Sequence, residues 1–107
     1  MKSALIVWGG WDGHEPRQCA DLFAAELTNR GFTVEVSSSL NALDDAARLA
    51  TFSLVVPIWT MGTITDVQEK NLINAVIAGT GLAGFHGGMG DSFRGSIGYQ
   101  WMVGGQF

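Results

Sequence analysis

Apolar residues follow two patterns along this chain: continuous runs and helical spacing. Nearly continuous apolar runs, such as residues 3–8, are typical of strands buried on both faces of a parallel sheet. Between these runs the apolar residues recur at helical spacing, as at Cys19, Phe23 and Leu27. The pattern predicts strands at residues 3–8, 32–36, 52–59 and 82–85. It predicts helices at residues 16–30, 41–50, 66–78 and 91–102.

Local signals mark the expected ends of several helices. Pro16 suits a first helical turn, where its missing N–H costs nothing, and Gly31 is a stop signal after the first helix. Asn41 is the expected cap of the second helix. Asp66, with Glu69 three residues later, resembles a capping box at the start of the third helix.

Strands that alternate with helices predict an α/β fold, in which a parallel sheet carries helices on both faces. We expect the strand order 2-1-3-4, with a ligand crevice at the carboxyl ends of the strands. The loops at residues 9–15, 60–65 and 86–91 would then converge on one edge. Because doubly wound sheets usually have five or more strands, either the sheet is small or a C-terminal portion of the domain is missing, and we favour a missing portion.

Composition narrows the class of protein. The 107 residues carry a net charge of −4 and are 47% hydrophobic, which predicts one ordered globular domain, residues 1–107. The six basic residues are scattered, which argues against nucleic acid as a partner. No stretch approaches the ~20 apolar residues that cross a bilayer, so we expect no membrane partner. The single cysteine, Cys19, fits a reducing compartment, and we expect a cytoplasmic protein.

The segment from Gly84 to Gly88 reads Gly-Phe-His-Gly-Gly, directly after the fourth predicted strand. A glycine-flanked turn of this kind holds a reactive side chain above the sheet in many α/β enzymes. Here the apex is His86, neither Ser nor Cys, so the usual covalent chemistry is absent. Because histidine gains and loses protons near neutral pH, His86 is our first candidate for a general acid or base. The alternative is a histidine that only shapes the turn.

The second histidine of the chain, His14, also falls in a predicted carboxyl-edge loop. We therefore take His14 and Asp91 as candidate catalytic partners of His86. Asp12 and Glu15 are candidate ligand-binding carboxylates in the same region. Each of these three acids could equally complement the positive end of a helix dipole.

Tryptophans and glycines supply the remaining candidate ligand contacts. Trp11 and Trp59 lie at the expected site edge, where a flat ring could hold a sugar, whereas Trp8 and Trp101 are expected in the core. The backbone N–H groups of the Gly87–Gly88 turn could face an anion. We predict no cofactor, although His14, His86 and one carboxylate leave a divalent metal site open. The sequence contains no H-x-x-x-H or H-E-x-x-H spacing to support that metal.

Three blocks of the chain, residues 4–15, 84–94 and 99–107, together resemble the ThuA-like (trehalose utilisation) proteins. That family is similar in fold to the class I glutamine amidotransferases, so the resemblance implies a flavodoxin-like three-layer sandwich. It covers about the first half of the family domain, and His14, His86 and Asp91 lie in the matching blocks. In the amidotransferases the elbow carries a cysteine, so His86 in this place argues against glutaminase activity.

The resemblance implies a role in disaccharide utilisation, and three functions remain open. The first is an enzyme that acts on a sugar or keto-sugar through His86, with a small-molecule sugar as partner. The second is a non-catalytic sugar-binding or regulatory module that kept the pocket. The third is an inactive fragment of the domain, whose unpaired fourth-strand edge would favour a homo-oligomer.

Overall fold

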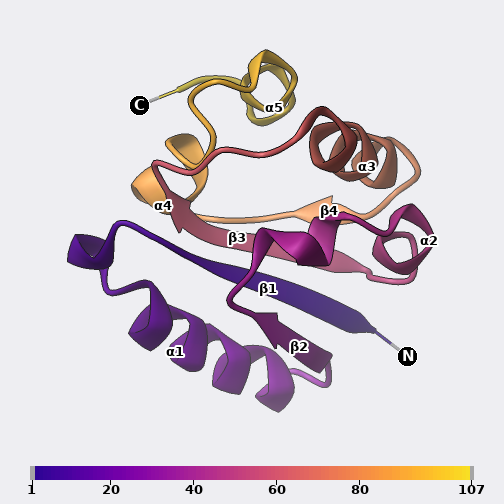
Figure 1. Ribbon diagram of the computed structural model, residues 1–107. Coiled ribbons are helices and arrows are strands. Elements are labelled where there is room, and N and C mark those ends of the chain that lie inside the picture. Colours follow the sequence, from indigo (N-terminus) through magenta and orange to yellow (C-terminus); the bar gives the residue numbers. More distant parts are fainter. Residues whose placement is uncertain (1, 107) are drawn as a thin grey trace.

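The structure, a computed structural model, describes residues 2–106, and its strands and helices alternate along the chain (Figure 1). The strands are β1 (Ser3–Gly10), β2 (Thr33–Ser37), β3 (Leu54–Thr60) and β4 (Gly81–Leu82). The α-helices are α1 (Pro16–Asn29), α2 (Ala46–Leu49), α3 (Asp66–Ile77), α4 (His86–Gly90) and α5 (Ile97–Val103), joined by the 3-10 turns η1 (Asp12–His14) and η2 (Leu40–Leu43). The sheet is parallel in the order β2-β1-β3-β4, which confirms the predicted α/β fold and strand order.

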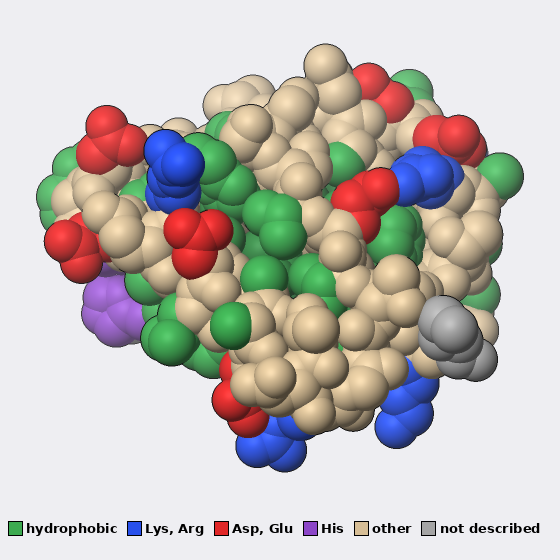
Figure 2. Space-filling model, turned by 90° about the horizontal axis from the view of Figure 1, so that it is seen from below, with side chains coloured by type: hydrophobic (Ala, Val, Ile, Leu, Met, Phe, Trp, Pro, Cys, Tyr) green, Lys and Arg blue, Asp and Glu red, His purple; other side chains and the backbone are tan. Residues whose placement is uncertain are grey.

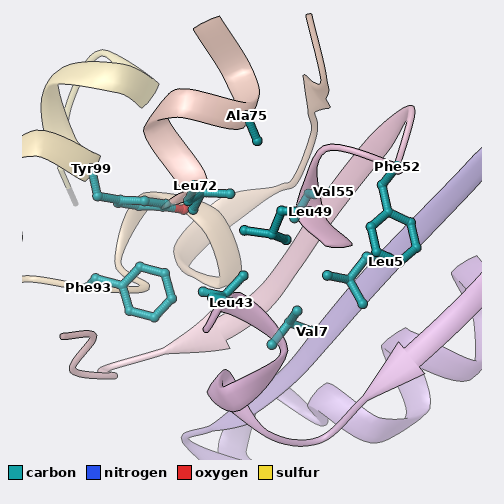
Figure 3. Close-up of a cluster of buried hydrophobic side chains, with 10 residues drawn as sticks. All are labelled: Leu5, Val7, Leu43, Leu49, Phe52, Val55, Leu72, Ala75, Phe93 and Tyr99. Carbon is teal, nitrogen blue, oxygen red and sulfur yellow. The ribbon is translucent and has the colours of Figure 1, made fainter. Parts of the chain in front are cut away.

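Helices cover both faces of the sheet and give the molecule three layers. In Figure 1, α1 lies below the sheet, and α3 and α5 lie above it. The short helix α2 contacts α3 and contributes Leu49 to the same hydrophobic cluster. The α1 side buries a small cluster made of Ile6, Ala20, Val56 and Ile58. The opposite side buries a larger cluster, labelled in Figure 3, that comprises Leu5, Val7, Leu43, Leu49, Phe52, Val55, Leu72, Ala75, Phe93 and Tyr99. Because β1 and β3 feed both clusters, they are apolar along most of their length.

The fourth strand is shorter than predicted. Its parallel pairing joins Gly81 to Leu54 and Leu82 to Val55, and the ladder goes no further within the described residues. Past Leu82, the Ala83 N–H still donates to the Val55 carbonyl oxygen at 3.1 Å, and Phe85 has extended backbone with φ −152° and ψ 148°. The apolar run therefore marks an extended segment of which only the beginning pairs in the sheet.

The helix predicted at residues 41–50 is wrong, because two capping side chains divide it. The Ser39 side chain accepts a hydrogen bond from the Asn41 backbone N–H and starts η2. The Asp45 carboxylate accepts hydrogen bonds from the N–H groups of Ala47 and Arg48 and starts α2. Because a short acidic side chain can satisfy the first N–H groups of a helix, Asp45 begins a new helix inside the predicted one. Asn41 is not the cap.

The third predicted helix begins where expected, but its capping box is made by other residues. Thr65 is the cap: its hydroxyl accepts from the Gln68 N–H, and the Gln68 side chain accepts from the Thr65 N–H. Asp66 and Glu69 lie in the first turn, where negative charge complements the helix dipole.

The helix predicted at residues 91–102 is also wrong at its start. Asp91 ends α4 as its C-cap, and Ser96 caps the separate helix α5. Tyr99 of α5 is buried, and its hydroxyl donates to the Met89 carbonyl oxygen at 2.7 Å. Trp101 is 83% exposed, which contradicts its expected place in the core. Residues two positions apart on a helix point in different directions, so an inward Tyr99 turns Trp101 outward.

The surface carries mixed charge. On the face in Figure 2 the Lys and Arg side chains are separated from one another and alternate with Asp, Glu and apolar surface. None of the helices within residues 2–106 has the length and apolar character that crossing a bilayer requires.

Candidate functional site

The loops that follow β1, β3 and β4 meet at one end of the sheet, where Figure 1 places α4 and the turn before α1. Each loop holds one residue other than glycine in the left-handed region. Among residues 2–106 these are Glu15 (φ 50°), Met61 (φ 62°) and His86 (φ 50°). Left-handed backbone at such residues costs about 1–3 kcal/mol and clusters at functional sites. The distribution of strain therefore marks this edge as the candidate site.

His14 is held from several sides. It ends η1 and is half-buried, and its Nδ1 lies 2.8 Å from the Thr60 hydroxyl oxygen at the end of β3. The Trp11 ring meets the His14 ring edge-on, with centroids 4.8 Å apart. Because Thr60 is itself buried, the hydrogen bond fixes both the position and the orientation of the imidazole.

His86 lies opposite His14 at the start of α4. The two rings meet edge-on with centroids 5.3 Å apart and an interplanar angle of 80°. His86 is exposed and follows the extended Phe85, so the chain passes from extended to helical backbone at His86 itself. This is the sharp, strained turn that the Gly84–Gly88 pattern predicts.

Asp91 is a buried carboxylate with a fixed partner. Its two oxygens accept hydrogen bonds from Nε and Nη2 of Arg94 at 2.5 and 2.8 Å. The Asp91 side chain is 7% exposed, whereas that of Arg94 is 56% exposed. The hydrogen bond from Arg94 lowers the pKa of Asp91, although burial opposes that shift, and His14 adds a smaller lowering effect. Asp91 is therefore an ionised anchor for Arg94 at neutral pH.

These residues surround a cavity of about 290 Å³, near the lower end of the size range of ligand pockets. Its lining combines two histidines, one ion pair and one aromatic ring: Trp11, His14, Thr60, Met61, His86, Gly87, Asp91 and Arg94. A smaller cavity of about 130 Å³ adjoins His14 and His86 on the side of Gly88 and Ile58. The three candidate catalytic residues are thus brought together.

Other candidates lie outside the larger cavity. Asp12 and Glu15 are exposed residues around η1 and do not line it. Trp59 is partly buried and packs against the larger hydrophobic cluster, and a Cβ atom at Gly9 or at Gly62 would clash with its ring. Its ring is therefore enclosed by the chain and does not form an open platform, in contrast to Trp11, which is 50% exposed.

Sequence reasoning missed Thr60 and Arg94. Thr60 is the last residue of a buried strand, paired with Gly10, and a polar residue at that point was an available signal. Arg94 follows Asp91 at a spacing of three, which often joins opposite charges on a helix, so this spacing was also an available signal.

Among the described residues, no third side chain joins His14 and His86 to complete a metal site. Within residues 2–106 no group of three His, Cys, Asp or Glu side chains is placed to hold a metal ion. Asp91, the candidate carboxylate that lines the same cavity as the histidines, is engaged by Arg94 through both oxygens.

Gly87 and Gly88 give a matched test of how tightly His14 is packed. A Cβ at Gly87 would lie 2.9 Å from His14 Cε1, whereas a Cβ at Gly88 would meet only Ile58 Cα at 3.7 Å. We expect Gly87→Ala to displace His14 and to cost about 1–3 kcal/mol through overpacking. Gly88→Ala should be neutral or stabilising by up to about 1 kcal/mol, because alanine is the better helix former.

Urea unfolding and the His14 imidazole NMR signals measure both effects. A changed His14 environment in Gly87→Ala, with little change in Gly88→Ala, is the expected pair of results. Equal shifts of His14 in the two variants would show that the ring is not held against Gly87.

The lowered pKa of Asp91 has a consequence for stability at acid pH. A carboxyl whose pKa is lower in the folded state adds stability above its unfolded pKa of about 4, and this stability is lost as pH falls through the folded value. In Arg94→Gln the carboxyl keeps its burial and loses its partner. We therefore expect this variant to lose less stability than the wild type between about pH 6 and about pH 3, measured as urea midpoints. If the urea midpoints of the wild type and of Arg94→Gln fell in parallel with pH, the Asp91–Arg94 ion pair would not stabilise the protein.

The comparisons with known proteins agree with the fold. The family model described as trehalose utilisation (ThuA) matches residues 3–107, so the chain belongs to the ThuA family. No curated protein sequence matches the chain.

A solved structure shows the same fold. A ThuA-like protein from Bacteroides uniformis superposes with a TM-score of 0.77 at 16% sequence identity. The match covers 97% of this chain and 44% of that chain, so this chain spans less than half the length of the solved protein. The flavodoxin-like three-layer fold expected from the sequence is thereby confirmed.

Proposed function

We propose that this protein acts on a carbohydrate or keto-sugar, with His86 and His14 as an acid–base pair. One observation carries the proposal: two imidazoles with centroids 5.3 Å apart face each other at the carboxyl edge of a parallel sheet, and one of them is on strained backbone. Membership of a trehalose utilisation family supports a sugar as the ligand.

Such a pair suits proton transfer next to a carbonyl group. One imidazole, unprotonated, takes a proton from the carbon beside the ketone of a keto-sugar. The other, protonated, gives a proton to the carbonyl oxygen, so the product is an enediol and the pair has exchanged charge states. No covalent intermediate is needed, which is consistent with an elbow that carries His86 in place of Ser or Cys.

The surrounding residues support proton exchange by this pair. Thr60 holds Nδ1 of His14, which leaves Nε2 as the nitrogen available to exchange protons. His86 is exposed, so it is the residue that a substrate reaches first. Trp11, half-exposed and in contact with His14, offers an apolar face to a sugar ring.

A proton NMR time course tests the proposal. The protein is incubated separately with trehalose and with the keto derivative of trehalose, and His86→Gln serves as the control. New sugar signals that require His86 are the expected result with the keto derivative. Binding of the keto derivative without any product over a long incubation would identify a non-catalytic sugar-binding module and refute the proposal.

A further inference from the structure

Arg94 has one hydrogen-bonding edge occupied and another directed away from its partner. A guanidinium group carries five N–H donors in a planar arrangement that can bind a carboxylate along two different edges. Asp91 takes the edge formed by Nε and Nη2. Within residues 2–106 the side chain of Arg94 has no other hydrogen-bond partner, so the edge formed by Nη1 and Nη2 remains for a ligand.

Arg94 is one of the residues at the candidate site. Arg94 lines the same cavity of about 290 Å³ as His14, His86 and Trp11, and its side chain is 56% exposed. Its orientation is fixed, because the buried Asp91 binds it through two hydrogen bonds and the Gln100 side chain donates to the Arg94 carbonyl oxygen. A preorganised guanidinium loses little entropy on binding a second oxyanion.

The charges around the cavity do not oppose an anion. Among the described residues that line it, Asp91 is the only acidic one, and Arg94 already balances that charge. The two histidines add no negative charge and become positive when protonated. A negatively charged ligand group therefore meets no unpaired carboxylate among these lining residues.

We propose that this site prefers sugars that carry a carboxylate, which the Nη1–Nη2 edge of Arg94 binds in a bidentate manner. This inference rests on the proposed function, since it names the substrate class of the same site. The carboxylate would fix one end of the sugar at Arg94 and place the remainder of the ring between Trp11 and the two histidines.

Binding of two matched probes tests this preference. Methyl α-D-glucuronide and methyl α-D-glucoside differ only by a carboxylate in place of a hydroxymethyl group. NMR titration of the wild type should show tighter binding of the glucuronide, and Arg94→Gln should weaken that binding about tenfold or more. The glucoside affinity should change little. Equal affinity of the wild type for the two probes, no binding of either, or an unchanged glucuronide affinity in Arg94→Gln would overturn the proposal.

Two further variants separate ligand binding from a structural role. Arg30→Gln makes the same charge change in an exposed ion pair with Glu26 and should leave the preference intact. Arg94→Lys keeps a positive charge beside Asp91 but lacks the planar edge, so it should lose the preference while remaining folded. Full preference for the glucuronide in Arg94→Lys would also overturn the proposal.

The variant His86→Gln separates this inference from the proposed function. It should keep the preference for the glucuronide and lose turnover. If the preference holds but turnover of the keto-sugar does not need His86, the proposed function fails and the carboxylate site stands. If turnover needs His86 but the two probes bind equally, the carboxylate site fails and the proposed function stands.

Discussion

Gly10→Ala is expected to destabilise the protein by about 3–5 kcal/mol, the largest stability effect at any position near the site. Gly10 has φ 79°, and a Cβ there would lie well under 3.0 Å from the Thr60 backbone oxygen. These two residues are paired across β1 and β3, so neither backbone can yield without opening the ladder. Because Thr60 also holds His14, the loss of stability should be accompanied by displacement of His14.

Gly31→Ala is the matched control, measured with Gly10→Ala by urea unfolding. Gly31 has φ 91°, similar backbone strain, but a Cβ there meets nothing within 4 Å. Gly31→Ala should lower the free energy of unfolding only by the strain of an alanine in left-handed backbone, about 1–2 kcal/mol. Equal destabilisation of the two variants would mean that the close approach of β1 and β3 at Gly10 adds nothing to the cost of Gly10→Ala.

His86→Gln is expected to lower turnover of the keto-sugar by about 10²–10⁴-fold, the range attributed to a positioned general acid or base. Glutamine keeps polarity and approximate size but does not exchange protons at neutral pH. His14→Gln should have an effect of the same order. Initial rates from the NMR time course give both values.

The double variant His86→Gln/His14→Gln distinguishes a pair from two separate contributors. Residues that act as one unit are strongly non-additive, so the double variant should be little slower than the slower single variant. Two losses that multiply would show that the histidines act in separate steps. A normal rate in His86→Gln would remove that residue from the chemistry altogether.

The order of strands and the identity of the site edge could be predicted from sequence, because both follow from long apolar runs. Residues 3–8 and 52–59 read as buried strands and form the centre of the sheet as β1 and β3. The chain from residue 40 onward was less predictable in its helices. Short polar side chains decide where helices start there, and Asp45, Thr65 and Ser96 each act as a cap that periodicity alone does not identify.

The candidate site was predictable in its residues but not in its contacts. His14 and His86 stood out because they are the only two histidines and both follow predicted strands. Their edge-on contact depends on Gly87, whose missing Cβ leaves room for the His14 ring, and on Thr60 in a different strand. Asp91 was predicted as a catalytic candidate, whereas the structure shows that both of its carboxylate oxygens are engaged by Arg94. Contacts of this kind join distant segments and leave no periodic signal.

Deuterium exchange measures the acid–base role of the histidine pair most directly. The protein is incubated with the keto derivative of trehalose in D₂O, and incorporation at the carbon beside the ketone is followed by NMR. The wild type is predicted to incorporate deuterium well above the rate in buffer, and His86→Gln to fall close to that background rate. Exchange in the wild type no faster than in buffer, or equal exchange in His86→Gln, would contradict proton transfer by this pair.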